Sequence, residues 1–233
     1  MPAPIFYWSE SARRFKDEQG RFVSRERMDA MRNRYYEREK SISAADAGKL
    51  FAGDWSLSEW RDRFGARVER IFTDQYVASR GGFPRMTDTD YRELAGMVEF
   101  QLDRLNNHFA VDLANGRYAV DQTQNVIDRM NLYVDASGQA WERGSLETFR
   151  GSPQLFLWRW LPGKEHCEDC EWANGRVGTA DYWLGLGMWP KSAGLSCIGI
   201  HCGCFMVPIE ESEIQDMLRA GLINKEALAQ TVT

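Results

Sequence analysis

All five cysteines of the 233-residue chain lie in its C-terminal third, at Cys167, Cys170, Cys197, Cys202 and Cys204. A Cys-x2-Cys pair on a tight turn presents both thiolates to the same side, which is how such pairs bind a tetrahedral Zn²⁺. A second cluster farther along the chain would complete the ligand set and close the intervening loop. Because thiolates are soft donors, they favour zinc over hard cations. The spacing therefore predicts a structural zinc site.

Five thiols exceed the four positions around a tetrahedral ion, so the sequence leaves the ligand set open. The firmest candidates are Cys167 and Cys170, which form the Cys-x2-Cys pair. The other two positions fall to two of four residues: Cys197, His201, Cys202 and Cys204. An iron–sulfur cluster and extracellular disulfides are the alternatives, although an odd number of cysteines fits a closed disulfide set poorly.

The same pattern argues against a catalytic metal. A catalytic zinc keeps one coordination position open, and four or five soft ligands leave none. Carboxylates do surround the first cysteine pair, at Glu165, Glu168, Asp169 and Glu171. However, the chain lacks the His-x-Glu that a zinc deaminase places before its cysteines. It also lacks a glycine-rich phosphate loop, a Gly-x-Ser-x-Gly turn and a Ser/His/Asp set. We therefore expect no enzymatic activity.

The composition is typical of a globular protein, with 43% hydrophobic residues, 27% charged residues and only 7 prolines. Such a composition excludes a disordered tail or a fibrous repeat. No run approaches about 18 apolar residues, which excludes a transmembrane helix. The first residues lack the basic start and apolar core of a signal peptide. We expect one or two domains and no membrane association.

The charge of the chain is uneven. The formal net charge is −5, whereas dedicated nucleic-acid-binding proteins are usually basic. The segment from Ser9 to Lys40 nevertheless carries an excess of arginine and lysine, which could contact a DNA backbone. The alternative is a solvated helix face with Glu/Arg pairs, as expected for Glu37, Arg38 and Glu39.

Hydrophobic periodicity predicts a mainly α protein. Residues 1–23 are expected to form an extended arm, whose aromatic triplet Phe6, Tyr7 and Trp8 should dock on another surface. Residues 24–150 are expected to form an antiparallel helical bundle. Its predicted helices span roughly residues 24–42, 43–51, 56–80, 87–114 and 120–143.

Two of these helices should begin with a capping box, in which a hydroxyl and a carboxylate three residues later cap each other's backbone donors. The two pairs are Ser56 with Glu59 and Thr87 with Asp90. Other aspartates of this region, such as Asp46 and Asp74, are interpreted as ordinary caps and helix faces.

Residues 151–210 are expected to form a small α+β module that zinc staples together. Apolar segments at 154–161 and 205–209 predict two strands. Pro208 has no backbone N–H, so the second strand should lie at a sheet edge. Residues 211–233 should form a C-terminal helix and tail. The tryptophans of this half could fill the small core or anchor an interface.

Three stretches of the chain resemble proteins of tailed phages. The start, from Arg13 to Ser24, looks like the arm found at the beginning of many virion proteins, and the segment from Trp60 to Thr87 resembles the helical part of minor head proteins. The ending, with its Cys-x2-Cys pair and final Cys202-Gly203-Cys204, is similar to that of the phage Mu F-like head morphogenesis family.

One position departs from the pattern of that family. Its members commonly carry a histidine three residues before the first cysteine of the final pair. Gly199 stands there in this chain and offers a metal no side chain. Cys197 would then take over the ligand role, which would make the ligand set all-thiolate.

The resemblance implies a structural protein of the virion, assembled in the cytoplasm of the bacterial host. It would be present in several copies and bind the portal or other capsid and neck proteins, with weak contact to packaged DNA at most. It implies a minor capsid protein of the head without enzymatic activity. A neck or tail component is one alternative, and a zinc-containing nucleic-acid-binding protein is another.

Overall fold

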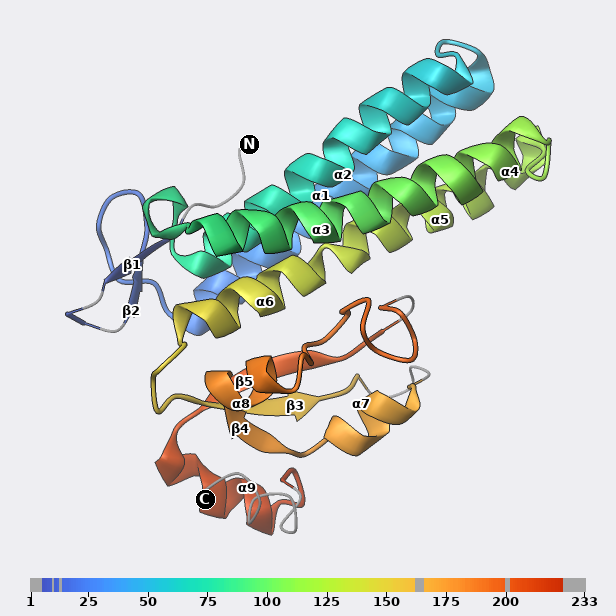
Figure 1. Cartoon of the computed structure of the whole chain (residues 1–233). Coiled ribbons are helices and arrows are strands. Elements are labelled where there is room, and N and C mark those ends of the chain that lie inside the picture. The colour runs from blue at the N-terminus through green and yellow to red at the C-terminus, as the bar shows by residue number, and fades with distance from the viewer. Residues whose placement is uncertain (1–5, 10, 13, 162–165, 200–201, 224–233) are drawn as a thin grey trace. The chain divides into compact units, whose positions relative to one another are not determined.

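The computed structural model describes residues 6–9, 11–12, 14–161, 166–199 and 202–223. Within them the protein is mainly helical, with small antiparallel sheets. The chain divides into two compact units, Met1–Ala140 and Trp141–Thr233 (Figure 1). None of the helices described is both long enough and apolar enough to cross a membrane.

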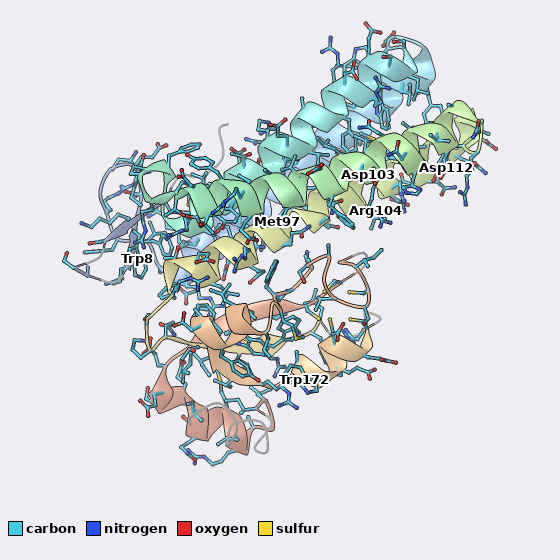
Figure 2. The ribbon with its side chains drawn as sticks, in the orientation of Figure 1. Trp8, Met97, Asp103, Arg104, Asp112 and Trp172 are labelled. Atoms are coloured by element: carbon cyan, nitrogen blue, oxygen red, sulfur yellow. The ribbon has the colours of Figure 1, made fainter. Side chains whose placement is uncertain are left out.

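The N-terminal arm folds back on itself and docks within its own unit. Strands β1 (Tyr7–Ser9) and β2 (Arg14–Lys16) pair as an antiparallel hairpin. The Trp8 backbone N–H donates to the carbonyl of Gly81, at 3.3 Å. A Cβ on Gly81 would lie 2.6 Å from that of Trp8, so only glycine allows this approach. The surface that receives the arm is therefore the end of α2 (Leu57–Arg80) (Figure 2).

Helix α1 (Arg25–Ala52) is continuous, so the predicted separate helix over 43–51 was wrong. The Ser43 hydroxyl donates to the carbonyl of Glu39 one turn earlier, at 3.0 Å. A serine that bonds back in this way stays compatible with the helix instead of ending it. Gly53, with φ of 79°, supplies the left-handed end.

Both predicted capping boxes are confirmed. At the start of α2 the Glu59 N–H donates to Ser56 Oγ, at 3.2 Å, and the Ser56 N–H donates to the Glu59 carboxylate, at 2.9 Å. At the start of α3 (Asp88–Arg104) Thr87 and Asp90 make the same reciprocal pair, at 3.2 and 2.8 Å. These caps fix where the two helices begin.

The remaining helices of this unit continue with two irregularities. A π-helical turn, η2 (Leu105–Phe109), joins α3 to the short α4. The predicted single helix over 120–143 is interrupted at Ser137, between α5 and α6, where the Ser137 hydroxyl donates to the Val134 carbonyl. The bounds are η1 Phe83–Arg85, α4 Ala110–Ala114, η3 Val120–Gln122 and α5 Thr123–Ala136, while α6 (Gly138–Thr148) begins in this unit and continues into the C-terminal one.

The core of the helical unit is aromatic. The long helices α1, α2, α3 and α5 run side by side (Figure 1). Trp60 and Phe64 of α2 stack at 5.5 Å between ring centroids. Phe109 meets Trp60 edge-on at 5.4 Å, and Tyr133 of α5 meets Phe64 edge-on at 5.7 Å. These rings are almost wholly buried and form part of one apolar cluster shared by the helices.

Charged groups are buried where α1 faces α2. Glu39 is 0% exposed, which makes the predicted solvated position wrong for this residue. Its carboxylate accepts from Arg38 at 2.5 Å and from Arg70 at 2.7 Å. A buried carboxylate is tolerated only when cations and hydrogen bonds compensate it, and these two arginines do so.

The same surface of α1 carries two more compensated groups. The Tyr35 hydroxyl donates to the Asp74 carboxylate at 2.6 Å, and Asp46 pairs with Arg67. Asp46 is 4% exposed, so the helix face that carries it is a buried one. Burial lowers the pKa of Arg67 to about 10, and burial followed by the bond to Asp74 raises the pKa of Tyr35.

The C-terminal unit is built on a three-stranded antiparallel sheet of order β4-β3-β5. As Pro208 predicted, β5 lies at an edge. β4 and two short helices, α7 and α8, were not foreseen in the sequence. The bounds are β3 Leu155–Arg159, α7 Glu168–Ala173, β4 Val177–Thr179, α8 Ala180–Gly185, β5 Phe205–Ile209, η4 Glu211–Glu213 and α9 Ile214–Arg219.

Strand β3 is covered on both faces by side chains of its own unit. Phe156 and Trp158 belong to an apolar cluster with Trp183, whose indole N–H donates to the Phe156 carbonyl at 3.2 Å. Leu157 points to the other face, where it joins Ile214 of α9. This alternation follows from the two-residue period of a strand. Three of the cysteines belong to the first cluster.

Candidate metal centre

Three segments of the C-terminal unit bring the cysteines together. Cys167 is the N-cap residue of α7, and Cys170 lies in the first turn of that helix. Cys197 lies in the loop that follows α8, and Cys202 and Cys204 lead directly into β5. A helix start, a loop and a strand start thus converge, which places all five predicted ligands in one region.

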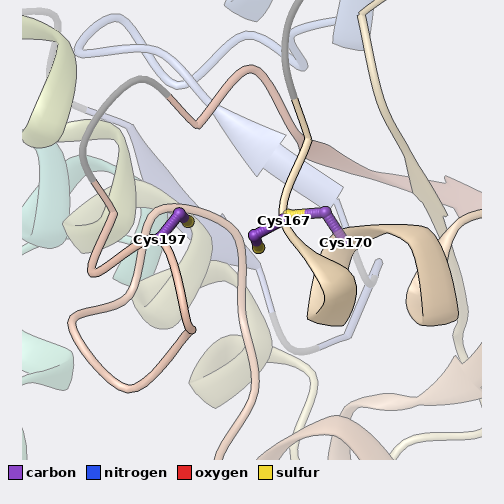
Figure 3. A group of neighbouring side chains, drawn as sticks. All are labelled: Cys167, Cys170 and Cys197. Atoms are coloured by element: carbon purple, nitrogen blue, oxygen red, sulfur yellow. The ribbon is translucent and has the colours of Figure 1, made fainter.

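The sulfur atoms form two groups that share one member. Those of Cys167, Cys170 and Cys197 all lie within 4.8 Å of one another, and so do those of Cys170, Cys202 and Cys204. Figure 3 shows the side chains of the first group gathered at the start of α7. Within the second group, Cys170 Sγ and Cys202 Sγ are 3.8 Å apart.

These distances fit a soft tetrahedral ion. A zinc–sulfur bond of about 2.3 Å places the sulfurs of a tetrahedral site about 3.8 Å apart. The Cys170–Cys202 pair already has that separation. Cys170, Cys202 and Cys204 are buried, and Cys167 and Cys197 are half-buried. The cluster can therefore hold a metal ion largely screened from water.

The loop that carries Cys197 is held in place by contacts outside the cysteines. The Ser196 N–H donates to the Asp169 carboxylate of α7 at 2.6 Å, which ties the loop to the helix that carries Cys170. Gly199 has a φ of 71°, and a Cβ there would lie 2.1 Å from the Lys191 carbonyl oxygen. The position where the resembling family has histidine therefore accepts only glycine in this backbone.

Proton sharing among the thiols shifts their pKa values in opposite directions. Hydrogen bonds from Cys170, Cys197 and Cys204 lower the pKa of Cys202, because neighbouring S–H groups stabilise its thiolate. The bonds that Cys197 makes to Cys170 and Cys202, together with burial, raise the pKa of Cys197. A bound divalent cation stabilises several thiolates at once.

The half-buried Cys167 differs from the other thiols. Burial would raise its pKa, but hydrogen bonds, first among them one with the Ser196 side chain, outweigh burial and lower it. A low thiol pKa favours the thiolate, which is the form that binds a metal.

Histidine and acidic residues contribute fewer candidate ligands to the described metal site than the sequence suggested. His201 and Glu165 lie outside the described residues. The His166 ring stacks on Trp160, with 4.1 Å between centroids. Among the residues described, the grouped ligand atoms all belong to cysteine, and all five cysteines are free thiols. Glu168 and Glu171 are exposed, whereas Asp169 binds Ser196.

The contact between Asp169 and Ser196 is the part of the site that the sequence did not reveal. The two residues are 27 positions apart, and Asp169 is only a spacer residue of the Cys-x2-Cys pair. Their only signal in the sequence is that each lies beside a cysteine, Asp169 before Cys170 and Ser196 before Cys197.

Comparisons of the chain with protein-family models, with curated proteins and with solved structures found no match. The site is therefore defined by its geometry, as a cluster of cysteines that could bind a metal ion.

Proposed function

We propose that the chain is a non-enzymatic structural protein of a tailed-phage virion. It is a minor head protein that docks at the portal or inner head, and one structural Zn²⁺ staples its C-terminal unit. The observation that carries the proposal is the thiol cluster that follows a helical unit, because this order matches the phage Mu F-like family. A neck or tail position within the same particle is the alternative.

The chemistry of the donors supports zinc in a structural role. The described ligand atoms are all sulfur, and soft sulfur donors select zinc over calcium or magnesium. Four thiolates complete a tetrahedral shell and leave no position for a water or substrate. The sheet of this unit has strands of only three to five residues, so a bound ion adds cross-links where the secondary structure is short.

An exposed aromatic residue in this unit offers a contact for a protein partner. Trp172 of α7 is 41% exposed, and the Arg176 guanidinium lies over its ring at 4.0 Å (Figure 2). Tryptophan and arginine are enriched among the residues that dominate binding energies. Trp158 and Trp183, by contrast, are fully buried and serve the core. In this proposal Trp172 contributes to docking on the portal or a neighbouring capsid protein.

The basic N-terminal segment supports DNA binding less well. Arg21 and Arg27 both approach the Asp17 carboxylate, at 2.8 and 3.8 Å. Lys40 pairs with Asp135 of α5 at 2.9 Å, and Arg38 binds Glu39. Because carboxylates of the same unit neutralise these cations, we expect only weak contact with packaged DNA.

The decisive experiment locates the protein in an intact particle. The wild-type gene is expressed with the remaining particle genes in the bacterial host, and purified heads are analysed for the protein and for zinc. We expect the protein to co-purify with portal-containing heads at one zinc per chain. Its absence from purified particles would end the proposal, and its presence only in tails would select the alternative.

A variant tests docking on the partner separately from metal binding. Trp172→Ala removes the exposed ring and leaves the five thiols intact. We expect this variant to bind zinc like the wild type and to enter heads less efficiently. In a separate assay, salt-sensitive binding of the free protein to duplex DNA would favour the nucleic-acid-binding alternative.

A further inference from the structure

The two thiol groups assign unequal roles to the five cysteines. This inference rests on the proposed zinc site, because it concerns which thiols hold that ion. A tetrahedral ion accepts four ligands, so one thiol of five is left over. If the five were equivalent, any one of them could be removed at the same cost. The geometry shows that they are not equivalent.

Cys170 is the member common to both groups. Its sulfur lies within 4.8 Å of those of Cys167 and Cys197 and also within 4.8 Å of those of Cys202 and Cys204. It is 1% exposed, and the first turn of α7 fixes its backbone. Each of the other four thiols belongs to one group only. Cys170 is therefore the thiol best placed to bind an ion that draws ligands from both groups.

We propose that Cys170 is the pivotal ligand of a thiol site with one ligand in reserve. The ion binds Cys170 and three of the four remaining thiols. When one of those four is missing, the other three complete the tetrahedron with Cys170. No such substitution exists for Cys170, because none of the remaining thiols belongs to both groups.

Five single substitutions of cysteine by serine test the proposal, and each variant serves as a control for the others. Every variant retains four thiols, so the number of possible ligands is the same and only their placement differs. Zn²⁺ affinity is measured by competition with a chelator, and Co²⁺ is used as the spectroscopic probe of thiolate coordination. The variants are Cys167→Ser, Cys170→Ser, Cys197→Ser, Cys202→Ser and Cys204→Ser.

We expect Cys170→Ser to lose far more affinity than the other variants. Changes in the groups that merely support metal ligands cost about 10- to 100-fold in affinity. Loss of the pivotal ligand should therefore cost more than about 100-fold, whereas each of the other four substitutions should cost less than about 10-fold. The Co²⁺ form of Cys170→Ser should also lose its thiolate charge-transfer absorption.

A measurement on the wild-type protein guards against misfolding of the variants. The protein is loaded with an NMR-active cadmium isotope, and scalar coupling from the metal to cysteine Hβ protons identifies the ligands directly. We expect coupling to Cys170 together with three other cysteines. Coupling to four cysteines that exclude Cys170 would overturn the proposal, as would equal Zn²⁺ affinity in all five variants.

Failure of the inference is distinguishable from failure of the proposed zinc site. If the wild-type protein binds neither Zn²⁺ nor Co²⁺, the site itself is refuted. If the wild type binds one ion and Cys170→Ser binds it equally well, the site stands and the pivotal role of Cys170 is refuted. Two ions per wild-type chain would also overturn the single-ion arrangement.

Discussion

The helical unit and the C-terminal unit bury polar groups by different means. In the helical unit each buried carboxylate has a partner in the same unit: Glu39 binds Arg38 and Arg70, and Asp90 binds Arg80. In the C-terminal unit Glu147 has such a partner in Arg143, but the buried polar groups also include three thiols, which lie against one another. The first unit supplies countercharges for its carboxylates, whereas in the proposed site a bound cation would stabilise the thiolates of the second.

This difference predicts how each unit depends on its surroundings. The aromatic core of the helical unit, centred on Trp60 and Phe64, owes nothing to a bound ion. The C-terminal unit has a core in which cysteines pack beside Trp158 and Trp183, so the proposed metal ligands are also part of its hydrophobic interior. Removing the ion should therefore loosen both the loops and the packing of this unit.

Metal removal should have the largest effect. A structural zinc site contributes on the order of 10 kcal/mol or more to folding of the module that holds it. We expect a chelator to abolish the protection of β3 and β5 against hydrogen exchange, while α2 and α3 keep theirs. Hydrogen exchange followed by mass spectrometry on the full chain provides the measurement. Equal loss of protection in both units would break the comparison.

Removal of a core ring in the helical unit should have the next largest effect. Phe64 is 1% exposed and contacts Trp60 and Tyr133. Phe64→Ala should lower the free energy of unfolding by about 3–5 kcal/mol, because it leaves a cavity. Denaturant unfolding gives that value. The control is Phe83→Ala, which removes a ring that is 56% exposed and should change stability little.

The Phe64→Ala variant should bind zinc with wild-type stoichiometry. Its core lies in the helical unit, whereas the thiols lie in the other. A large loss of zinc affinity in this variant would show that the two units are energetically coupled.

Breaking the buried ion pair between Asp90 and Arg80 should have the third largest effect on stability. Its carboxylate accepts from Tyr76 at 2.9 Å, from Arg80 at 3.2 Å and from the Thr87 N–H at 2.8 Å. Asp90→Asn leaves Arg80 without its countercharge, and breaking one side of a buried pair costs about 3 kcal/mol or more. Asp112→Asn is the control, because its pair with Arg117 lies at the surface and contributes about 0–1 kcal/mol.

The Asp90 effect should depend on pH in a defined direction. Burial opposes the charged form, but the bonds from Thr87, Tyr76 and Arg80 outweigh burial and lower the pKa of Asp90 below 3.8. A lowered pKa stabilises the fold above the unfolded value, and this contribution is lost as the pH falls through the folded value. The stability difference between wild type and Asp90→Asn should therefore be full at neutral pH and shrink below about pH 4.

The sequence predicted well the features that depend on a few neighbouring residues. The caps at Ser56 and Thr87, the helix end at Gly53 and the edge position of the strand with Pro208 each follow from local backbone chemistry. The convergence of the cysteines was also predictable, because thiols at metal-binding spacing carry a specific chemical signal.

Features that depend on distant partners were not predictable in this way. The local sequence predicts a surface position for Glu39, because Arg70, one of the arginines that neutralise it, lies 31 residues away in the chain. The tie between Asp169 and Ser196 also spans a long loop. The sequence likewise gave no means of choosing among five thiols, since spacing does not reveal that Cys170 lies between two groups.

The smallest predicted effect concerns a cap that the sequence already identified. Ser56→Ala removes the hydroxyl that accepts from the Glu59 N–H at 3.2 Å, and loss of such a cap costs about 1 kcal/mol. Ser58→Ala, two residues later and also exposed, is the matched control. Because alanine is a better helix former than serine, Ser58→Ala should leave the free energy of unfolding unchanged or raise it slightly.

Measured together, the two serine variants test whether a small loss of stability in the helical unit affects the C-terminal unit. Both alter only the first turn of α2. The midpoint temperature for unfolding of the helical unit should therefore fall in Ser56→Ala but not in Ser58→Ala. The Zn²⁺ affinity of both variants should stay at the wild-type value. A lower Zn²⁺ affinity in Ser56→Ala alone would mean that stability lost in the helical unit reaches the thiol cluster, and the units would then have to be treated as one folding system.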